Sequence, residues 1–162
     1  MDFSSNARDG YGTDWPVRYK DMKPWYDYVE EFVGVSGTLE GMEQLPDGIF
    51  LPPIGFNCAE EEFGRRIGNT FNDRRLIPGR CAHLTEPKPI HTDLGRGTCQ
   101  SRNQCQRGCS LGAYFSSQSA TLPAAKRTGN LTIITDSIVD SIIYDPKNKK
   151  ASGVRVIDSR TN

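Results

Sequence analysis

The feature of this sequence that most constrains its fold is a run of three short segments near the C-terminal end. They are residues 131–135, 138–144 and 154–157, and all three are rich in β-branched side chains. Such side chains fit the pleated surface of a sheet, so each segment is predicted to be a β-strand. Residues 145–149 form the polar loop predicted between the last two strands. The sequence therefore predicts a small β meander over residues 130–162.

The rest of the chain is predicted to be loop-rich and helical, which makes the fold class α+β. Residues 17–34 place apolar side chains three and four positions apart, the period of an amphipathic helix. Pro24 predicts that this helix begins close to it, because proline is tolerated in the first turn and breaks an interior. Gly34 is the predicted stop. The aromatic side chains here are predicted to pack in a core, and the alternative is a stacking platform for a ligand.

Two further helices are predicted. Asn57 and Glu60 have the spacing of a capping box, which predicts a helix immediately after Asn57. Residues 116–128 are helix formers that precede a glycine. Residues 35–56, in contrast, are rich in glycine and proline and are predicted to be irregular. Within them, Pro46-Asp47-Gly48 predicts a tight turn.

Charge and hydropathy narrow the classes of function. The 162 residues carry no net formal charge, and their interspersed acids and bases give no sign of a nucleic-acid surface. No apolar run approaches the roughly 20 residues that span a bilayer. The first ten residues lack the layout of a secretory signal peptide. The odd number of cysteines, five, favours a reducing, cytoplasmic setting, with the periplasm as the alternative.

The cysteines of residues 99–129 are a candidate metal site. Cys99, Cys105 and Cys109 are separated by five and three residues, and His91 could supply a fourth ligand. Structural zinc sites usually have tighter ligand pairs, and this spacing favours neither a disulfide nor an iron–sulfur cluster. We expect these cysteines to pack a compact, glycine-containing loop. His91 and the other histidine, His83, lie in no recognisable motif and are expected to be ordinary surface or core residues.

The same part of the chain resembles the glucose–methanol–choline (GMC) family of flavin oxidoreductases. The residues that carry the resemblance are Gly108-Cys109-Ser110-Leu111-Gly112-Ala113 and the segments 117–122, 130–135, 138–142 and 151–156. Asp14-Trp15-Pro16, Tyr19-Lys20-Asp21-Met22 and Pro24-Trp25-Tyr26 are similar to the choline-dehydrogenase-like bacterial branch of that family.

This resemblance implies a cofactor and a division into domains. The cofactor is FAD, and the position of Val139 lies against its adenine through the protein backbone. Residues 130–162 would belong to the FAD-binding domain, and residues 1–98 would be part of the substrate domain with a connecting arm. Residues 99–129 would form the cysteine loop and the helix that follows it. The fold would thus be an incomplete piece of a two-domain structure.

The sequence departs from the family pattern at the motifs that bind the cofactor and catalyse the reaction. It lacks the G-x-G-x-x-G fingerprint that seats a pyrophosphate, and the catalytic histidine of the family is not found in it. We therefore expect an internal segment of a larger enzyme, with no catalytic residue and no metal ligand of its own, and inactive alone. The parent would oxidise a CH–OH group of a sugar, polyol or choline-like alcohol by hydride transfer to FAD.

The alternative function is a small cysteine-loop module that binds a metal or a protein partner. The partner implied for the parent is a small-molecule alcohol, with no nucleic acid and no membrane span. Residues 131–135 are predicted to form an apolar strand without neighbours, and such edges pair with other chains. We therefore expect copies of the chain to associate through strand edges.

Overall fold

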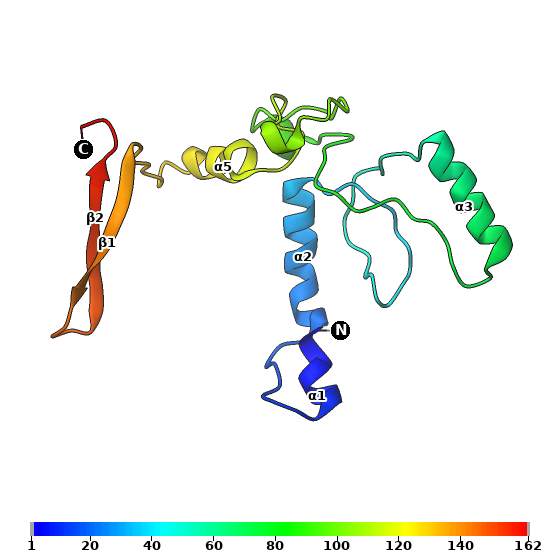
Figure 1. The fold of residues 1–162 in the computed structure, drawn as a ribbon, viewed down its shortest axis with the longest axis horizontal. Coiled ribbons are helices and arrows are strands. Elements are labelled where there is room, and N and C mark those ends of the chain that lie inside the picture. Colours follow the sequence, from blue (N-terminus) through cyan, green and yellow to red (C-terminus); the bar gives the residue numbers. More distant parts are fainter. Residues whose placement is uncertain (1, 162) are drawn as a thin grey trace. The chain divides into compact units, whose positions relative to one another are not determined.

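The computed structural model describes residues 2–161, which divide after Arg127 into two compact units. We call residues 2–127 the helical unit and residues 128–161 the hairpin unit. Figure 1 shows helices in the first and a two-stranded sheet in the second. The chain is therefore a mixed α+β piece, as predicted.

Short helices joined by long loops make up the helical unit. In chain order they are η1 (Asp2–Ser4), α1 (Ser5–Asp9), α2 (Tyr19–Val33), α3 (Cys58–Thr70), α4 (Pro89–Thr92), η2 (Cys105–Arg107), η3 (Ser117–Thr121) and α5 (Leu122–Arg127). The helices predicted over 17–34 and after Asn57 correspond to α2 and α3. The helix predicted over 116–128 is divided into a π-helical turn, η3, and the α-helix α5.

Helix α2 begins five residues before Pro24, so the predicted start near Pro24 is wrong. The Asp21 carboxylate accepts a hydrogen bond from the backbone N–H of Arg18 at 2.8 Å, which fixes the first turn. Pro24 lies inside the helix on an exposed face. Its missing N–H removes one intrahelical hydrogen bond. Gly34 ends the helix in the left-handed conformation, at φ +79°, as predicted.

Helix α3 confirms the predicted capping box. The Asn57 side chain accepts the backbone N–H groups of Ala59 and Glu60 at 3.0 and 3.1 Å. The Glu60 carboxylate in turn accepts the N–H of Asn57 at 2.8 Å. Three backbone donors at the helix start are satisfied in this reciprocal way.

The π-helical turn η3 has a local cause. Pro123 is the second residue of α5 and has no N–H to donate. The turn before it widens, and the N–H of Leu122 bonds to the carbonyl of Ser117, five residues back. The Ser116 hydroxyl caps this turn by accepting the N–H of Ser119 at 3.1 Å. A helical period in the sequence does not distinguish such a turn from an α-helix.

The core of the helical unit is small. Its buried apolar residues, among those described, are Leu51, Leu84, Ala113 and Ala120. Backbone hydrogen bonds between distant segments surround it, such as Leu84 N–H to Ala113 O at 3.0 Å. Cys99, Cys109 and Leu111 pack against the same cluster. Hydrogen bonds across loops, as well as apolar packing, therefore hold this unit together.

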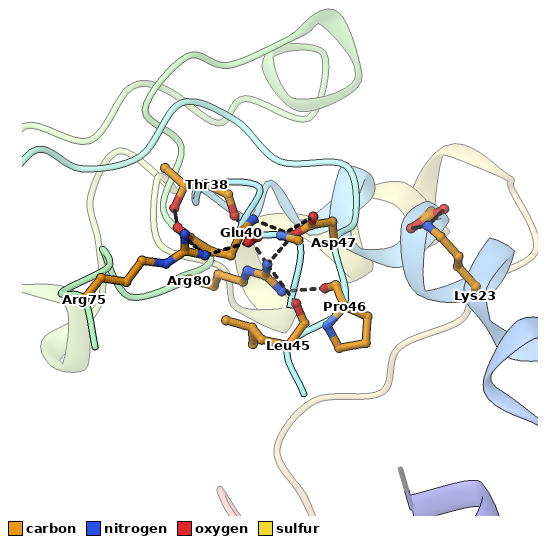
Figure 2. Close-up of polar contacts among 10 residues, drawn as sticks. Lys23, Thr38, Glu40, Leu45, Pro46, Asp47, Arg75 and Arg80 are labelled. Atoms are coloured by element: carbon orange, nitrogen blue, oxygen red, sulfur yellow. Dashed lines mark hydrogen bonds and ion pairs between the residues drawn. The ribbon is translucent and has the colours of Figure 1, made fainter. Parts of the chain in front are cut away.

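A clasp centred on Arg80 fixes the loop of residues 38–47 (Figure 2). The Arg80 guanidinium donates to Pro46 O at 2.6 Å and to the Asp47 carboxylate at 2.9 Å. Asp47 also accepts the backbone N–H groups of Glu40 and Gly41. The tight turn predicted at residues 46–48 is wrong, because the chain reverses earlier, where Leu45 N–H bonds to Met42 O. Asp47 closes this loop instead of forming a turn.

The hairpin unit contains two antiparallel strands, β1 (Ser137–Asp145) and β2 (Lys150–Asp158). The predicted loop between them is confirmed, and the Asp145 carboxylate accepts the N–H of Lys147 at 2.9 Å. The strand predicted at residues 131–135 is wrong, because no strand is assigned there. Asp136, at φ +56°, redirects the chain just before β1. The predicted meander is thus a single hairpin.

Both faces of this hairpin are apolar and uncovered. Eight large apolar side chains on the two strands are between 40% and 68% exposed: Ile138, Val139, Ile142, Ile143, Tyr144, Val154, Val156 and Ile157. An isolated two-stranded hairpin is marginally stable in water. Its sequence is therefore that of a sheet element normally packed against another layer.

Candidate functional site

Val139, the predicted cofactor contact, lies at an irregularity in β1. It pairs with Val156 of β2, and the next pair along the strand joins Ser141 to Arg155. Asp140 lies between these pairs and has no partner residue in the register. A bulge of this kind leaves backbone groups without a partner on the neighbouring strand and bends the strand that carries it.

The surroundings of Val139 suit the edge of a purine ring. The side chain is 59% exposed, and backbone groups beside the bulge can donate and accept hydrogen bonds. Adenine presents both donors and acceptors along its edges together with two apolar faces. These groups could hold the adenine end of FAD, and the contact at Val139 stays a prediction. Nothing in this unit resembles a cradle for the pyrophosphate among the residues that the structure describes.

The cysteine loop, residues 99–115, surrounds a small cavity in the helical unit. Cys99, Cys105 and Cys109 all border this cavity of about 40 Å³, and all are free thiols. His83 and Tyr114 form part of its wall, with their ring centres 5.0 Å apart. The cavity has room for about a water molecule.

His83 and Cys105 contact each other at this cavity. The His83 Nε2 atom lies 3.4 Å from the Cys105 Sγ atom. The other ring nitrogen, Nδ1, is buried and has no hydrogen-bond partner in the described structure. This histidine therefore offers one nitrogen to the thiol and leaves one unused.

The thiol of Cys109 lies among backbone N–H groups. Those of Tyr114, Leu111, Ala113 and Gly112 point toward it, and together they lower the pKa of the thiol against the opposing effect of burial. A concave set of amides stabilises an anion, so this cysteine has more thiolate character than an ordinary one.

His91, the predicted fourth ligand candidate, is not part of this cluster. Its Nε2 atom donates to Glu31 O at 2.8 Å, and its Nδ1 atom accepts the backbone N–H of Lys88 at 2.9 Å. Both nitrogens are occupied, and the side chain is fully buried. Within residues 2–161, no group of three or more His, Cys, Asp or Glu side chains is arranged to hold a metal ion.

The aromatic residues of α2 are not a core, contrary to the prediction. Trp25 is 65% exposed, and Tyr26 and Tyr28 are exposed as well. Tyr26 stacks on Tyr19 with a ring-centre distance of 6.1 Å. Both tyrosines border an open cavity of about 440 Å³. Helix α2 therefore presents an aromatic surface.

Glu30, on the same helix, also borders the open cavity. Burial, with a smaller contribution from Asp27, raises the pKa of its carboxyl group. One of its oxygens and the Arg80 Nε atom are buried without hydrogen-bond partners in the described structure. Because these two atoms are closed off from solvent, they do not reach into the cavity.

Comparison with known proteins places the chain in a family. The family model for GMC oxidoreductases matches residues 56–162, which is more than half of the chain and includes the cysteine loop and the hairpin. The chain belongs to the GMC oxidoreductase family. Members of this family are flavin-dependent oxidoreductases, and FAD is their typical cofactor.

Two curated relatives match most of the chain at low identity. The large subunit of fructose dehydrogenase from Gluconobacter japonicus is 26% identical over 152 residues, which cover 91% of this chain and 26% of the relative. A 2-methyl-1,2-propanediol dehydrogenase from Mycolicibacterium austroafricanum is 28% identical over 167 residues, covering 99% of this chain and 28% of the relative. The chain therefore spans about a quarter of the length of these relatives. No helix among residues 2–161 is long and apolar enough to cross a membrane.

Sequence reasoning missed Arg96 altogether, and it treated His91 as an ordinary surface or core histidine without finding its role at the end of α2. Arg96 is 2% exposed and lies in the sequence Gly95-Arg96-Gly97. A charged residue between two glycines is a usable signal, because flanking glycines let the backbone approach a guanidinium closely. No local pattern identifies the carbonyls that such a residue binds.

Proposed function

We propose that this chain is part of a GMC dehydrogenase in which the hairpin unit lies against the adenine of FAD through the backbone at Val139. The bulge beside Val139 supports this placement, because it leaves backbone groups outside the β1–β2 ladder. In the whole enzyme, FAD accepts a hydride from the carbon of a CH–OH group. This chain contributes binding and orientation, and the chemistry requires the rest of the protein.

The proposed substrate is a hydroxylated small molecule: a sugar, a polyol or a choline-like alcohol. Both relatives are named for dehydrogenation of hydroxyl-bearing compounds, fructose in one and a propanediol in the other. The similarity of residues 14–26 to the choline-dehydrogenase-like bacterial branch supports the third class. On this proposal residues 1–98 belong to the substrate domain, and residues 130–162 belong to the FAD-binding domain.

A proline substitution tests the adenine contact. In the full-length enzyme Val139→Pro removes the backbone N–H at the bulge, whereas Val139→Ala keeps it. Loss of one hydrogen bond to the adenine weakens FAD binding about tenfold, measured by flavin fluorescence during titration. Ala151→Pro, on β2 near the loop, is the matched control for distortion of the hairpin. Equal FAD affinity of the Val139→Pro and Val139→Ala enzymes, or an equal loss in Ala151→Pro, contradicts the proposal.

The alternative function is a small cysteine-loop module that binds a metal or a protein partner. Three thiols and His83 border one cavity, although these side chains are not arranged as a metal site among the described residues. Metal analysis of the purified chain separates the alternatives. Stoichiometric zinc or iron that is lost in a Cys105→Ser variant favours the module, and a metal-free preparation favours packing as the role of these cysteines.

The hairpin also supports association between copies of the chain. The outer edges of β1 and β2 are unpaired in the two-stranded sheet, and exposed apolar edges pair with other strands. This replaces the predicted edge at residues 131–135, where no strand forms. Light scattering at increasing concentration measures the association.

A further inference from the structure

The end of helix α2 carries backbone carbonyls that the helix itself cannot satisfy. Gly34 N–H and Val35 N–H both bond to Glu30 O at 3.0 Å, and the next three carbonyls point beyond the last turn. The final carbonyls of any helix need partners from outside, especially where the end is buried. Here those partners come from about sixty residues further along the chain.

Two side chains supply them. His91 Nε2–H donates to Glu31 O at 2.8 Å. The Arg96 guanidinium donates to Phe32 O at 3.4 Å and to Val33 O at 2.9 Å. A positive charge at this end of a helix is also favoured by the helix dipole. His91 and Arg96 are 0% and 2% exposed, so water does not compete for these carbonyls.

Arg96 also reaches a third segment. Arg96 Nε–H donates to Gly112 O in the cysteine loop at 2.9 Å, so one guanidinium joins α2 to that loop. Gly97 N–H to Leu111 O at 2.7 Å and Leu84 N–H to Ala113 O at 3.0 Å reinforce the connection. We call His91, Arg96 and the four carbonyls they bind the helix-end clamp.

Two glycines allow the clamp to close. A Cβ atom added at Gly34 would lie 2.1 Å from Leu84 Cδ2 and 3.2 Å from His91 Nε2. A Cβ atom added at Gly112 would lie 3.3 Å from Arg96 Cγ. Both glycines have positive φ, +79° and +60°. The backbone is therefore shaped around these two buried side chains.

The clamp requires a neutral His91. Its Nδ1 atom accepts the backbone N–H of Lys88 at 2.9 Å while Nε2 donates, which fixes the tautomer. A proton added at Nδ1 would place two N–H groups against each other. The charged groups that face the ring are Arg96, Lys88 and Glu31, and Glu31 is itself paired with Lys88 at 3.0 Å. Burial is the largest cause that lowers the pKa of His91. The hydrogen bond to Glu31 O opposes it, and the nearby charges of Arg96 and Lys88 lower the pKa further by smaller amounts.

We propose that the helix-end clamp is a proton-sensitive latch, in which proton uptake at His91 releases helix α4 from the end of α2 while Arg96 keeps its bonds to α2 and to the cysteine loop. The proton comes from solvent and is bound at Nδ1. The Lys88 N–H then loses its acceptor, and the imidazolium leaves its buried position toward water. Opening is linked to protonation because the released histidine has a higher pKa than the clamped one.

The linkage has a defined window and slope. Below the ordinary histidine pKa near 6.5, the open form binds the proton and the clamped form does not. The fraction of open molecules therefore rises about tenfold for each pH unit. The rise stops once the pH falls through the lowered pKa of the clamped histidine. Above the ordinary value the latch is closed and insensitive to pH.

Amide hydrogen exchange of the whole chain between pH 8 and pH 5 tests this latch. The Lys88 amide, which bonds to His91 Nδ1 at 2.9 Å, should lose protection about tenfold per pH unit below 6.5, after correction for intrinsic exchange. The Phe71 amide, bonded to Ile67 O at the end of α3, is the internal control and should keep its protection. The nitrogen chemical shifts of His91 should report the Nε2–H tautomer at pH 8 and protonation over the same range as the loss.

Two variants complete the test. His91→Gln retains a donor for Glu31 O and cannot take up the proton, so the protection of its Lys88 amide should not change with pH. His83→Gln, at the only other histidine, should keep the wild-type response. A wild-type slope in His91→Gln overturns the proposal. So does a Lys88 amide whose protection stays constant while the His91 shifts show protonation, a result that needs no variant to fold.

Discussion

The helical unit and the hairpin unit differ in the interactions that stabilise them. The helical unit buries few apolar side chains but ties distant segments together through Arg80, His91 and Arg96. The hairpin unit has a regular register and many apolar side chains, yet both of its faces are exposed. The comparison shows that apolar content does not locate a core. In this chain, buried hydrogen bonds to carbonyls hold the helical unit together. The hairpin unit has regular apolar strands whose faces another layer of the protein would have to cover.

Removing Arg96 from the helical unit should change the free energy of unfolding more than any other substitution proposed here. Arg96→Ala leaves Phe32 O, Val33 O and Gly112 O without their donor inside a small core. Buried unsatisfied groups are costly, so the free energy of unfolding should fall by about 3 kcal/mol or more. Urea unfolding followed by the fluorescence of Trp15 and Trp25, both in the helical unit, measures it. Arg155→Ala on the exposed face of β2 is the control and should change it by less than about 0.5 kcal/mol. Similar effects of the two substitutions would remove the distinction.

The next largest difference in stability should come from replacing one glycine in each unit with alanine. Gly34→Ala puts a methyl group 2.1 Å from Leu84 at a positive φ, and the strain with the overlap should cost about 2–3 kcal/mol. Gly153→Ala in β2 has ordinary φ and its nearest neighbour at 3.9 Å. That change should be neutral or stabilising by about 0.5 kcal/mol. Thermal unfolding of both variants measures the pair. A harmless Gly34→Ala substitution would show that the end of α2 is not held tightly.

The two units should lose stability at different pH values as acid is added. The pKa of His91 is lowered in the folded chain, so the stability that it contributes is complete above pH 6.5 and declines as the pH falls below that value. In the hairpin, hydrogen bonds from Asn148 and Lys147 lower the pKa of Asp145 from its ordinary value near 3.8. Its contribution is present above that value and is lost only at lower pH. Far-ultraviolet circular dichroism and tryptophan fluorescence from pH 8 to pH 3 should show the helical unit responding first. Loss of the hairpin first would reverse the comparison.

The smallest effect on folding should come from a charge on the hairpin face. Ile142 is 68% exposed, so Ile142→Lys should change the stability of the helical unit by less than about 0.5 kcal/mol. The same substitution should reduce the apparent mass of concentrated samples in light scattering, because a charged strand disfavours pairing. Lys126→Gln in α5 is the control for a change of surface charge. Association that Ile142→Lys leaves intact would place the contact elsewhere.

Local patterns predicted most of the elements, and distant contacts account for the errors. The period of α2, the box formed by Asn57 and Glu60, and the loop after Asp145 depend on neighbours within four residues. In contrast, the residues at 131–135 have strand propensity but no adjacent strand to pair with in the hairpin unit. Asp47 has turn propensity but is used by Arg80, more than thirty residues away. A sequence pattern contains no information about such partners.

The candidate sites divide in the same way. β-branched residues predicted the strand that carries Val139, whereas its adenine contact came from the resemblance and stays a prediction. The bulge beside it is visible only in the register of the two strands. Spacing grouped Cys99, Cys105 and Cys109 correctly around one cavity but added His91 in place of His83. The histidine that contacts this cavity is farther away in sequence than the one that does not. Proximity in sequence was therefore misleading at this point.

The two arms of the helix-end clamp differ in how they respond to their surroundings. A guanidinium keeps its charge throughout the range in which proteins fold, so the bonds of Arg96 to α2 and to the cysteine loop do not depend on acidity. The imidazole of His91 does change. Acid would therefore free the His91 end of residues 91–96 from α2 while the Arg96 end stays bound to it. Arg96 would be the fixed point of this movement, and the freed segment would return to its clamped position when the proton is lost.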